Sequence, residues 1–200
     1  MSASWLNLGF ASQYATLGTG IPHRVEARYY TSLTVNPTAN TVPMVEGRAY
    51  ALPIVITKSV TIDRIAILVD LVGGEGSVVR AGLYNANQAT ADITTLIVDA
   101  GTASVETGGV KEYTVSQAMP PGVFYVVVVC QGAAATRPAL RGQIPSGSWR
   151  STSAPFSGNS PYPGLYGNAN TVPGALPDPL GVPFTGNDAA MPTTMVRFTA

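Results

Sequence analysis

The alternation of hydrophobic and polar residues over the first two thirds of the chain predicts a series of β-strands. In residues 48–56, the apolar side chains of Tyr50, Leu52, Ile54 and Ile56 recur at every second position. A period of two places these side chains on one face of an extended strand. The segment therefore has one face toward a hydrophobic core and belongs to a sheet.

Residues 59–71 form a second alternating run, in which the apolar face changes once. Val60 and Ile62 follow one phase, and the alternation resumes at Ile65 in the other phase, after Asp63 and Arg64. A change of phase inside a strand indicates one extra residue, which is how a β-bulge shows in a sequence. We therefore expect a bulge or bend at Asp63-Arg64.

The most apolar stretch of the chain is residues 123–130, which contain Val126, Val127, Val128 and Val129 and end at Cys130. A strand that is apolar on both faces is covered on both sides, or lies in the middle of the core. Cys130 is the only cysteine, so the chain forms no internal disulfide and has no cysteine-based zinc site. We interpret Cys130 as a small buried hydrophobic residue.

These runs recur about every ten residues and are separated by turn sequences rich in Gly, Pro and Asn, as in an antiparallel sandwich. No window shows a capped, amphipathic helical stripe. The sequence therefore predicts an all-β fold, an antiparallel, jelly-roll-like β-sandwich formed as a single domain. The predicted strands are residues 48–56, 59–71, 77–84, 93–99, 110–115 and 123–130.

Two segments differ from this pattern. Residues 1–22 form an N-terminal arm that fits neither period and has no signal-peptide pattern. The sandwich domain is expected to span residues 23–200, including a long excursion at residues 142–192 that holds nine of the sixteen prolines. Residues 193–199 alternate again, so we expect them to return the chain to the sandwich as a strand.

Aromatic side chains are spaced through the arm and the excursion, where regular structure is not expected. Flat aromatics beside small polar residues can stack on sugars or anchor a protein interface. They can equally fold inward and form a small core beneath the loop. The candidate contact residues for a ligand or partner are Trp5, Phe10, Trp149, Phe156, Tyr162 and Tyr166.

Charge is sparse and balanced, with 11 basic and 11 acidic residues in 200. A neutral surface provides no long-range attraction for a phosphate backbone, so we expect no nucleic-acid binding. The longest apolar run has about nine residues, whereas a membrane-spanning helix needs about 20, so we expect no membrane insertion. The use of a single cysteine fits synthesis in a reducing cytoplasm.

The sequence offers little for catalysis, and we expect no enzyme, no catalytic residue and no cofactor. His23 is the only histidine, and no nucleophile-elbow, phosphate-loop or zinc-binding motif is present. A pair of carboxylates assembled by the fold remains an alternative, as in glycoside hydrolases. No metal site is assigned, although a calcium ion at a turn is an alternative, with oxygens from acids such as Asp63, Asp70, Glu75, Asp92, Asp99, Glu106 and Glu112.

An ordered series of short segments gives the chain a resemblance to a known family. The series is Tyr29-Tyr30, Asp63-Arg64-Ile65, Ser77 to Asn85, Val98 to Gly101, Gly109 to Glu112, Pro121 to Tyr125 and Gln131-Gly132. It resembles a β-sandwich module of tailed-phage virion proteins, of the tail-fibre or minor-tail type. The resemblance covers about residues 29–141, and it implies a structural role in the particle with no catalytic residues to transfer.

Three functions follow as hypotheses. The first is a tail or fibre-type virion protein, made in the host cytoplasm and located in the virion, that contacts the host surface. The second is a capsid decoration, or cement, protein, since the chain has no stalk repeat or coiled coil. The third is a carbohydrate-binding module. The expected partners are copies of the chain and other virion proteins, with a host-surface glycan as a further candidate.

Overall fold

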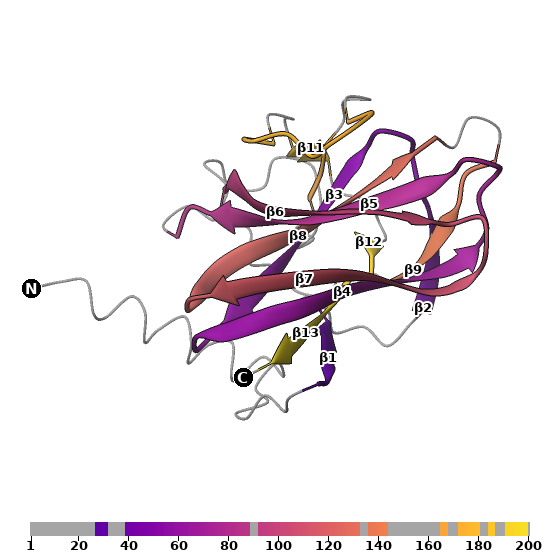
Figure 1. Cartoon of the computed structure of the whole chain (residues 1–200). Coiled ribbons are helices and arrows are strands. Elements are labelled where there is room, and N and C mark those ends of the chain that lie inside the picture. Colours follow the sequence, from indigo (N-terminus) through magenta and orange to yellow (C-terminus); the bar gives the residue numbers. More distant parts are fainter. Residues whose placement is uncertain are drawn as a thin grey trace, which may run out of the picture.

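The computed structural model consists of two antiparallel β-sheets packed face to face (Figure 1). No helix occurs among the described residues, so this part of the chain contains no helix that is long and apolar enough to cross a membrane. This confirms the predicted all-β, jelly-roll-like sandwich. The structure describes residues 27–31, 39–88, 92–132, 136–143, 165–167, 172–180, 184–186 and 191–199.

Sheet A has seven strands, and its longest strand, β4, is central. One long edge of β4 pairs with β7, and the other pairs first with β13 and then with β9. Beyond these, β1 pairs with β13, while β2 and β12 pair with β9. The strands of sheet A are β1 (Tyr29–Thr31), β2 (Ala39–Pro43), β4 (Val60–Leu71), β7 (Gly109–Met119), β9 (Ala139–Gln143), β12 (Met191–Pro192) and β13 (Met195–Thr199).

Sheet B has six strands in the order β11-β10-β3-β8-β5-β6. The pair formed by β3 and β8 is continuous over eight residues, from Ala49 opposite Val129 to Ile56 opposite Gly122. The strands of sheet B are β3 (Ala49–Ile56), β5 (Val78–Ala86), β6 (Ile93–Ser104), β8 (Gly122–Gln131), β10 (Leu165–Gly167) and β11 (Phe184–Gly186).

The main core lies between the sheets and uses alternate residues of each strand, as the period of two requires. The buried residues from sheet B include Tyr50, Leu52, Ile54, Ile56, Val79, Ala81, Leu83, Phe124, Val126, Val128 and Cys130. From sheet A they include Ile62, Ile65, Ile67, Val69, Tyr113, Val115, Met119, Leu140, Val196 and Phe198. The buried hydroxyl of Tyr113 also donates a hydrogen bond across the core to the carbonyl of Val79, at 2.8 Å.

Strand β8 is buried on both faces, as its sequence predicts. Val126 and Val128 face the core between the sheets, whereas Val127 and Val129 belong to a second hydrophobic cluster on the outer face of sheet B. All four valines have an exposed fraction of 0%. A run of consecutive apolar residues is therefore explained by two separate cores, one on each side of the strand.

The predicted change of face in β4 is also present. The register shifts between Ile62 and Arg64 against β7, and at the same position against β13. Ile62 and Ile65 are both fully buried although they lie three residues apart. The irregularity at Asp63 lets both side chains enter the core, because it resets the alternation by one residue.

Strand β6 continues well past its predicted end at Asp99. Between Asp99 and Thr102 its register shifts against β5, and Gly101 takes a positive φ of 81°. The Asp99 carboxylate accepts a hydrogen bond from the Gly101 amide at 2.9 Å. The Ala100-Gly101 pair is therefore a bulge inside a longer strand.

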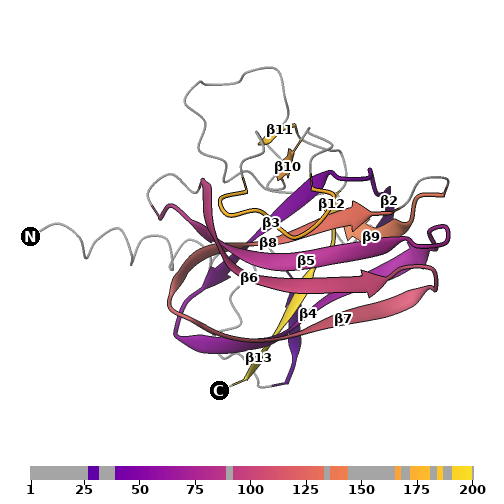
Figure 2. The same cartoon turned by 45° about the horizontal axis from the view of Figure 1, so that its top comes forward.

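Parts of the excursion belong to the sheets. Its two ends meet where Gln143 of β9 pairs with Met191 of β12. Within it, β10 adds to the edge of sheet B by pairing with β3, and β11 pairs with β10 (Figure 2). The last strand, β13, pairs with β4, which confirms the predicted return of the chain to the sandwich.

Candidate functional site

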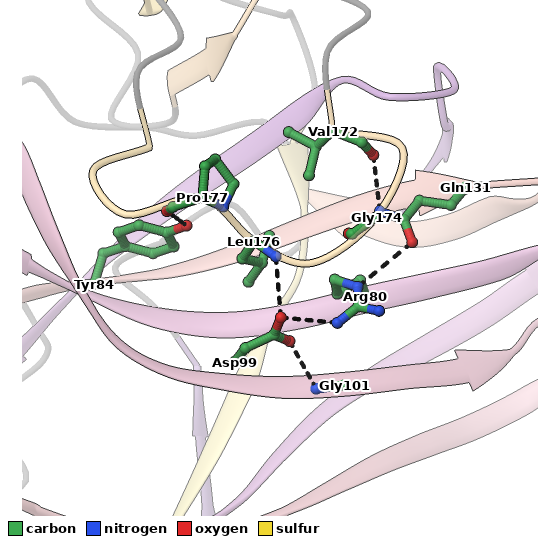
Figure 3. Close-up of polar contacts among 9 residues, drawn as sticks. All are labelled: Arg80, Tyr84, Asp99, Gly101, Gln131, Val172, Gly174, Leu176 and Pro177. Atoms are coloured by element: carbon green, nitrogen blue, oxygen red, sulfur yellow. Dashed lines mark hydrogen bonds and ion pairs between the residues drawn. The ribbon is translucent and has the colours of Figure 1, made fainter.

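The most elaborate arrangement of side chains lies on the outer face of sheet B, where Val172–Leu180 crosses the sheet (Figure 3). We call this part of the excursion the strap. Val172, Leu176 and Leu180 are buried, with exposed fractions of 1%, 4% and 3%. They pack on a cluster formed by Ala49, Ala51, Tyr84, Ala86, Tyr125, Val127 and Val129. The strap thus covers an apolar sheet face that water would otherwise contact.

A glycine in β5 makes room for the strap. A Cβ atom on Gly82 would overlap the Cδ1 atom of Leu176 and would lie 2.8 Å from the carbonyl oxygen of Val98. A glycine inside a strand often marks such a close approach of another segment. The side chain of Leu176 therefore packs directly against the backbone of β5, in the space that a side chain at position 82 would occupy.

Polar groups of sheet B hold the backbone of the strap at both ends. The Gln131 amide donates to the carbonyls of Val172, at 2.8 Å, and Gly174, at 2.7 Å. The Tyr84 hydroxyl donates to the carbonyl of Pro177, at 2.7 Å. These bonds satisfy carbonyl groups that have no strand partner.

Asp99 is the centre of this network (Figure 3). Its Oδ2 atom accepts from the Leu176 amide at 3.0 Å and from Arg80 Nη1 at 2.8 Å, while Oδ1 accepts from Gly101. Arg80 also reaches Gln131 Oε1, at 3.5 Å. Asp99 and Arg80 have side chains about one-fifth exposed, so the pair is partly shielded from solvent.

The strap also contributes a carboxylate that binds the backbone of sheet B. Asp178 accepts a hydrogen bond from the Leu96 amide of β6, at 2.9 Å. Burial, followed by the charges of Asp99 and Asp178, raises the pKa of the Tyr84 hydroxyl above its ordinary value. Tyr84 therefore remains protonated, and keeps donating to the strap, at pH values where an exposed tyrosine begins to ionise.

The outer face of sheet A carries ion pairs and differs from that of sheet B. Arg197 of β13 binds the bulge residue Asp63 through two nitrogens, with Nη2 to Oδ2 at 2.5 Å. The guanidinium also lies over the Tyr29 ring, 5.7 Å from its centroid, and the Tyr29 hydroxyl donates to Glu112. The cluster links β1, β13, β4 and β7 across the sheet.

A second ion pair lies further along the same sheet. Arg141 of β9 donates two hydrogen bonds to Asp70 of β4, at 2.7 and 2.9 Å, and Thr41 of β2 donates a third at 3.3 Å. Hydrogen bonds from Arg197 and Arg141 hold the pKa values of Asp63 and Asp70, respectively, below the ordinary range. Both acids are thus ionised and link strands of sheet A through ion pairs.

The candidate chemical groups take structural positions where they are described. Among the described residues, no three His, Cys, Asp or Glu side chains converge to hold a metal ion. Asp63, Asp70 and Asp99 are bound by arginines, and Glu106 accepts from the Gly76 amide. Cys130 is fully buried, and burial, with a smaller effect of Glu46, raises the pKa of its thiol to about 12.

Most of the predicted contact residues fall outside the described part of the chain, and so does His23. This applies to Trp5, Phe10, Trp149, Phe156 and Tyr162. The backbone of Tyr166 is described, in β10, where it pairs with Tyr50 and Gly186. The proposal that these residues make contacts therefore stays a prediction.

Sequence reasoning did not identify the strap or the residues that bind it. The available signal is the spacing of Val172, Leu176 and Leu180 at four-residue intervals inside a proline-rich segment. A second signal is Gly82, an isolated glycine in an otherwise regular strand. Neither signal by itself identifies a partner surface.

The chain was also compared with known proteins. No protein-family model matches it, and no curated protein does. Its fold is similar to chains in structures of infectious bursal disease virus, strains Gt and Gx, with TM-scores of 0.37 and 0.34. A third similar chain, with a TM-score of 0.32, comes from T=1 particles derived from infectious bursal virus.

All three matches are distant and partial. Each is 12% identical to this chain and covers 86% of it, whereas the chain spans 42%, 41% and 35% of their lengths. At this level of similarity, no activity, substrate or partner is transferred. The chain is an all-β sandwich with a strapped outer face.

Proposed function

We propose that this chain is a non-enzymatic structural component of a phage virion, of the tail or fibre type. Its partners are copies of itself and neighbouring virion proteins, and its location is the particle. The excursion contributes the surface that meets the host. This proposal follows the resemblance to tailed-phage tail modules and is supported by where the resembling residues lie.

The observation that carries the proposal is the distribution of those residues over the framework. Asp63-Arg64-Ile65 forms the bulge of β4, and Ser77 to Asn85 covers β5. Val98 to Gly101 contains the bulge of β6, and Pro121 to Tyr125 begins β8. The resembling segments thus fix registers, bulges and turns of one sandwich, which supports a common scaffold rather than a common reaction centre.

The engagement of the acids also supports a structural role. Asp63 and Asp70 join strands that are distant in sequence, through Arg197 and Arg141, and Asp99 joins β5 to β6 through Arg80 and to the strap through the Leu176 amide. The oxygens of acids held this way are occupied by hydrogen bonds. Such acids are suited to stabilising the fold and poorly suited to exchanging protons with a substrate.

The positions of four strands support the proposal that the two contact surfaces lie on opposite sides of the sandwich. Strands β1 and β13 lie on one side of the sandwich, and β10 and β11 on the opposite side, in both views (Figures 1 and 2). The N-terminal arm precedes β1, whereas the excursion carries β10 and β11. In the proposed role, Trp5 and Phe10 contact neighbouring virion proteins, and Trp149, Phe156, Tyr162 and Tyr166 contact the host surface.

The experiment is to locate and count the chain in purified particles. Antibody labelling in electron microscopy should place it on the tail, and quantitative mass spectrometry should give a copy number that fits tail symmetry. A copy number that fits the capsid lattice, with label over the shell, would replace the tail assignment with capsid decoration. Absence from the particle would reject both.

A second measurement addresses the outward surface. Phage carrying Trp149→Ala or Tyr162→Ala should assemble normally but adsorb more slowly to host cells, because removing an aromatic anchor weakens a contact. The matched control is Thr57→Ala, at an exposed turn of the framework. Equal adsorption by all variants would remove host contact from the proposal while leaving the structural role intact.

A further inference from the structure

Two of the four sheet edges are short, and only two are long. Strands β1 and β2 form one edge of sheet A, with three and five residues, and β2 contains Pro43. Strand β11, at one edge of sheet B, has three residues. Short strands and proline are standard protection against pairing with another chain. The long edges are β6 and β7, with twelve and eleven residues.

The β6 edge is interrupted. Its register against β5 shifts three times, and one of its amides, that of Leu96, is bound by Asp178 of the strap. Bulges and a covering segment both blunt an edge. Strand β7, in contrast, contains no proline, has one register shift, and pairs only with β4 among the described strands.

The charges of β7 do not protect its free edge. The carboxylate of Glu112 accepts a hydrogen bond from Tyr29, which lies on the far side of β4 and β13. The ammonium group of Lys111 binds Thr107 in the preceding turn, at 2.7 Å. Both charged side chains are thus held by their own chain, and the remainder of β7 is uncharged.

The exposed apolar residues lie at the start of this strand. Val110 of β7 is 64% exposed, and Leu71 and Val72, where β4 ends, are 60% and 46% exposed. These three are the exposed large hydrophobic residues of the described part of the chain. A free edge combined with an apolar patch is typical of a surface that pairs with another strand.

We propose that β7 is a self-association surface, where the β7 strands of two copies pair antiparallel and join their A sheets. A two-fold axis at Thr114 places Val110 opposite Ala118 and Glu112 opposite Ser116 of the partner copy. All four side chains are exposed, on the outer face. The register sets no charge against a like charge, and it pairs apolar with apolar, so a second copy complements the strand.

This register can be tested by charge exchange in the full-length chain. The double variant Val110→Lys/Ala118→Lys places like charges opposite each other at two symmetric positions, whereas Val110→Lys/Ala118→Glu places opposite charges there. Thr57→Lys/Thr102→Lys, at exposed positions outside β7, is the matched control. Sedimentation velocity over a range of concentrations gives the oligomeric state, and thermal unfolding checks each fold.

The wild-type chain and the control should form dimers, and the Lys/Lys variant should be monomeric but still unfold in one cooperative thermal transition, without the concentration-dependent rise in melting temperature that dimerisation gives the wild type. The Lys/Glu variant should dimerise, with an affinity that falls as salt rises. A monomeric wild-type chain, or a Lys/Lys variant that dimerises like the wild type, would overturn the β7 pairing. The inference deepens the self-assembly part of the proposed function, but its failure leaves the location in the virion untouched, since no particle is used.

Discussion

Leu176 occupies the space that a side chain at position 82 would need. Gly82 lies in the middle of β5, and the strap residue Leu176 contacts its backbone from the outer face of sheet B. The fit joins a framework strand to a segment of the proline-rich excursion nearly one hundred residues away in the chain. The excursion is therefore partly integral to the domain.

The replacement Gly82→Ala should destabilise the protein by about 1–3 kcal/mol, because the new methyl group overlaps Leu176 and approaches the Val98 carbonyl. Denaturant unfolding measures the change. In a Leu176→Ala background the same glycine replacement should cost less, but still something, since the Val98 contact remains. Gly174→Ala, which adds a Cβ with no atom within 4 Å, should be neutral. Equal effects of both glycine replacements would contradict the fit.

Asp99→Ala should loosen the strap, because it removes the acceptor for the Leu176 amide and leaves Arg80 without its carboxylate. An unpaired amide costs about 1–3 kcal/mol when buried. Hydrogen exchange followed by mass spectrometry should show faster exchange in residues 172–180, with β3 and β8 unchanged. Glu75→Gln, at an exposed turn, is the control. Unaltered strap exchange in Asp99→Ala would remove Asp99 from this role.

Adjacent valines of β8 should respond differently to a buried charge. Val128→Asp places a carboxylate between the sheets and should abolish folding, because the cost of several kcal/mol is large against a total of about 5–15 kcal/mol. Val127→Asp places it beneath the strap, so strap release offers partial relief. Circular dichroism and thermal melting compare the two variants. A Val128→Asp protein that melts like the wild type would show that the main core is wrongly assigned.

Stability should fall in acid as Asp63 and Asp70 are protonated. Arg197 and Arg141 lower the pKa of each acid in the folded state below its unfolded value of 3.8. The stabilisation is therefore present above about pH 4 and is lost as the pH falls through the lower, folded-state pKa values. Urea midpoints measured across this range should drop less steeply for Asp63→Asn than for the wild type. Parallel curves would exclude Asp63 as a source of the acid sensitivity.

The Cys130 thiol should be unreactive in the folded protein, because it is fully buried and its pKa is raised to about 12. A maleimide reagent at neutral pH should label the chain only after denaturant is added. The labelling rate then reports global unfolding. Rapid labelling without denaturant would show that the β8 end of the core opens locally.

Hydrophobic periodicity was sufficient for the framework because each framework strand buries one face or both. The phase change around Asp63 and the continuous valines of β8 are direct consequences of packing, so both were readable. The end of β6 was not predictable in this way, since the bulge at Gly101 breaks the alternation and can be recognised only when the partner strand is known. The length of a strand that contains a bulge depends on its pairing with a neighbouring strand, and hydrophobic periodicity carries no information about that pairing.

The strap was not predictable for a related reason. Three isolated apolar residues among prolines carry no period that fixes a surface, and the groups that hold them are dispersed along the chain. Gln131 and Tyr84 bind main-chain carbonyls, which leave no side-chain signature in the sequence. Only the fold brings Asp99 to the Leu176 amide.

The closure of the excursion at its base gives the chain a replaceable cassette. Because Gln143 and Met191 are neighbours across β9 and β12, the framework meets both ends of the segment at one place. The entropy of closing a loop grows only slowly with its length, so insertions beyond the strap are inexpensive for the sandwich. Related chains could therefore differ in the length and sequence of this cassette, and engineers could graft peptides into it, while the strap residues keep sheet B covered.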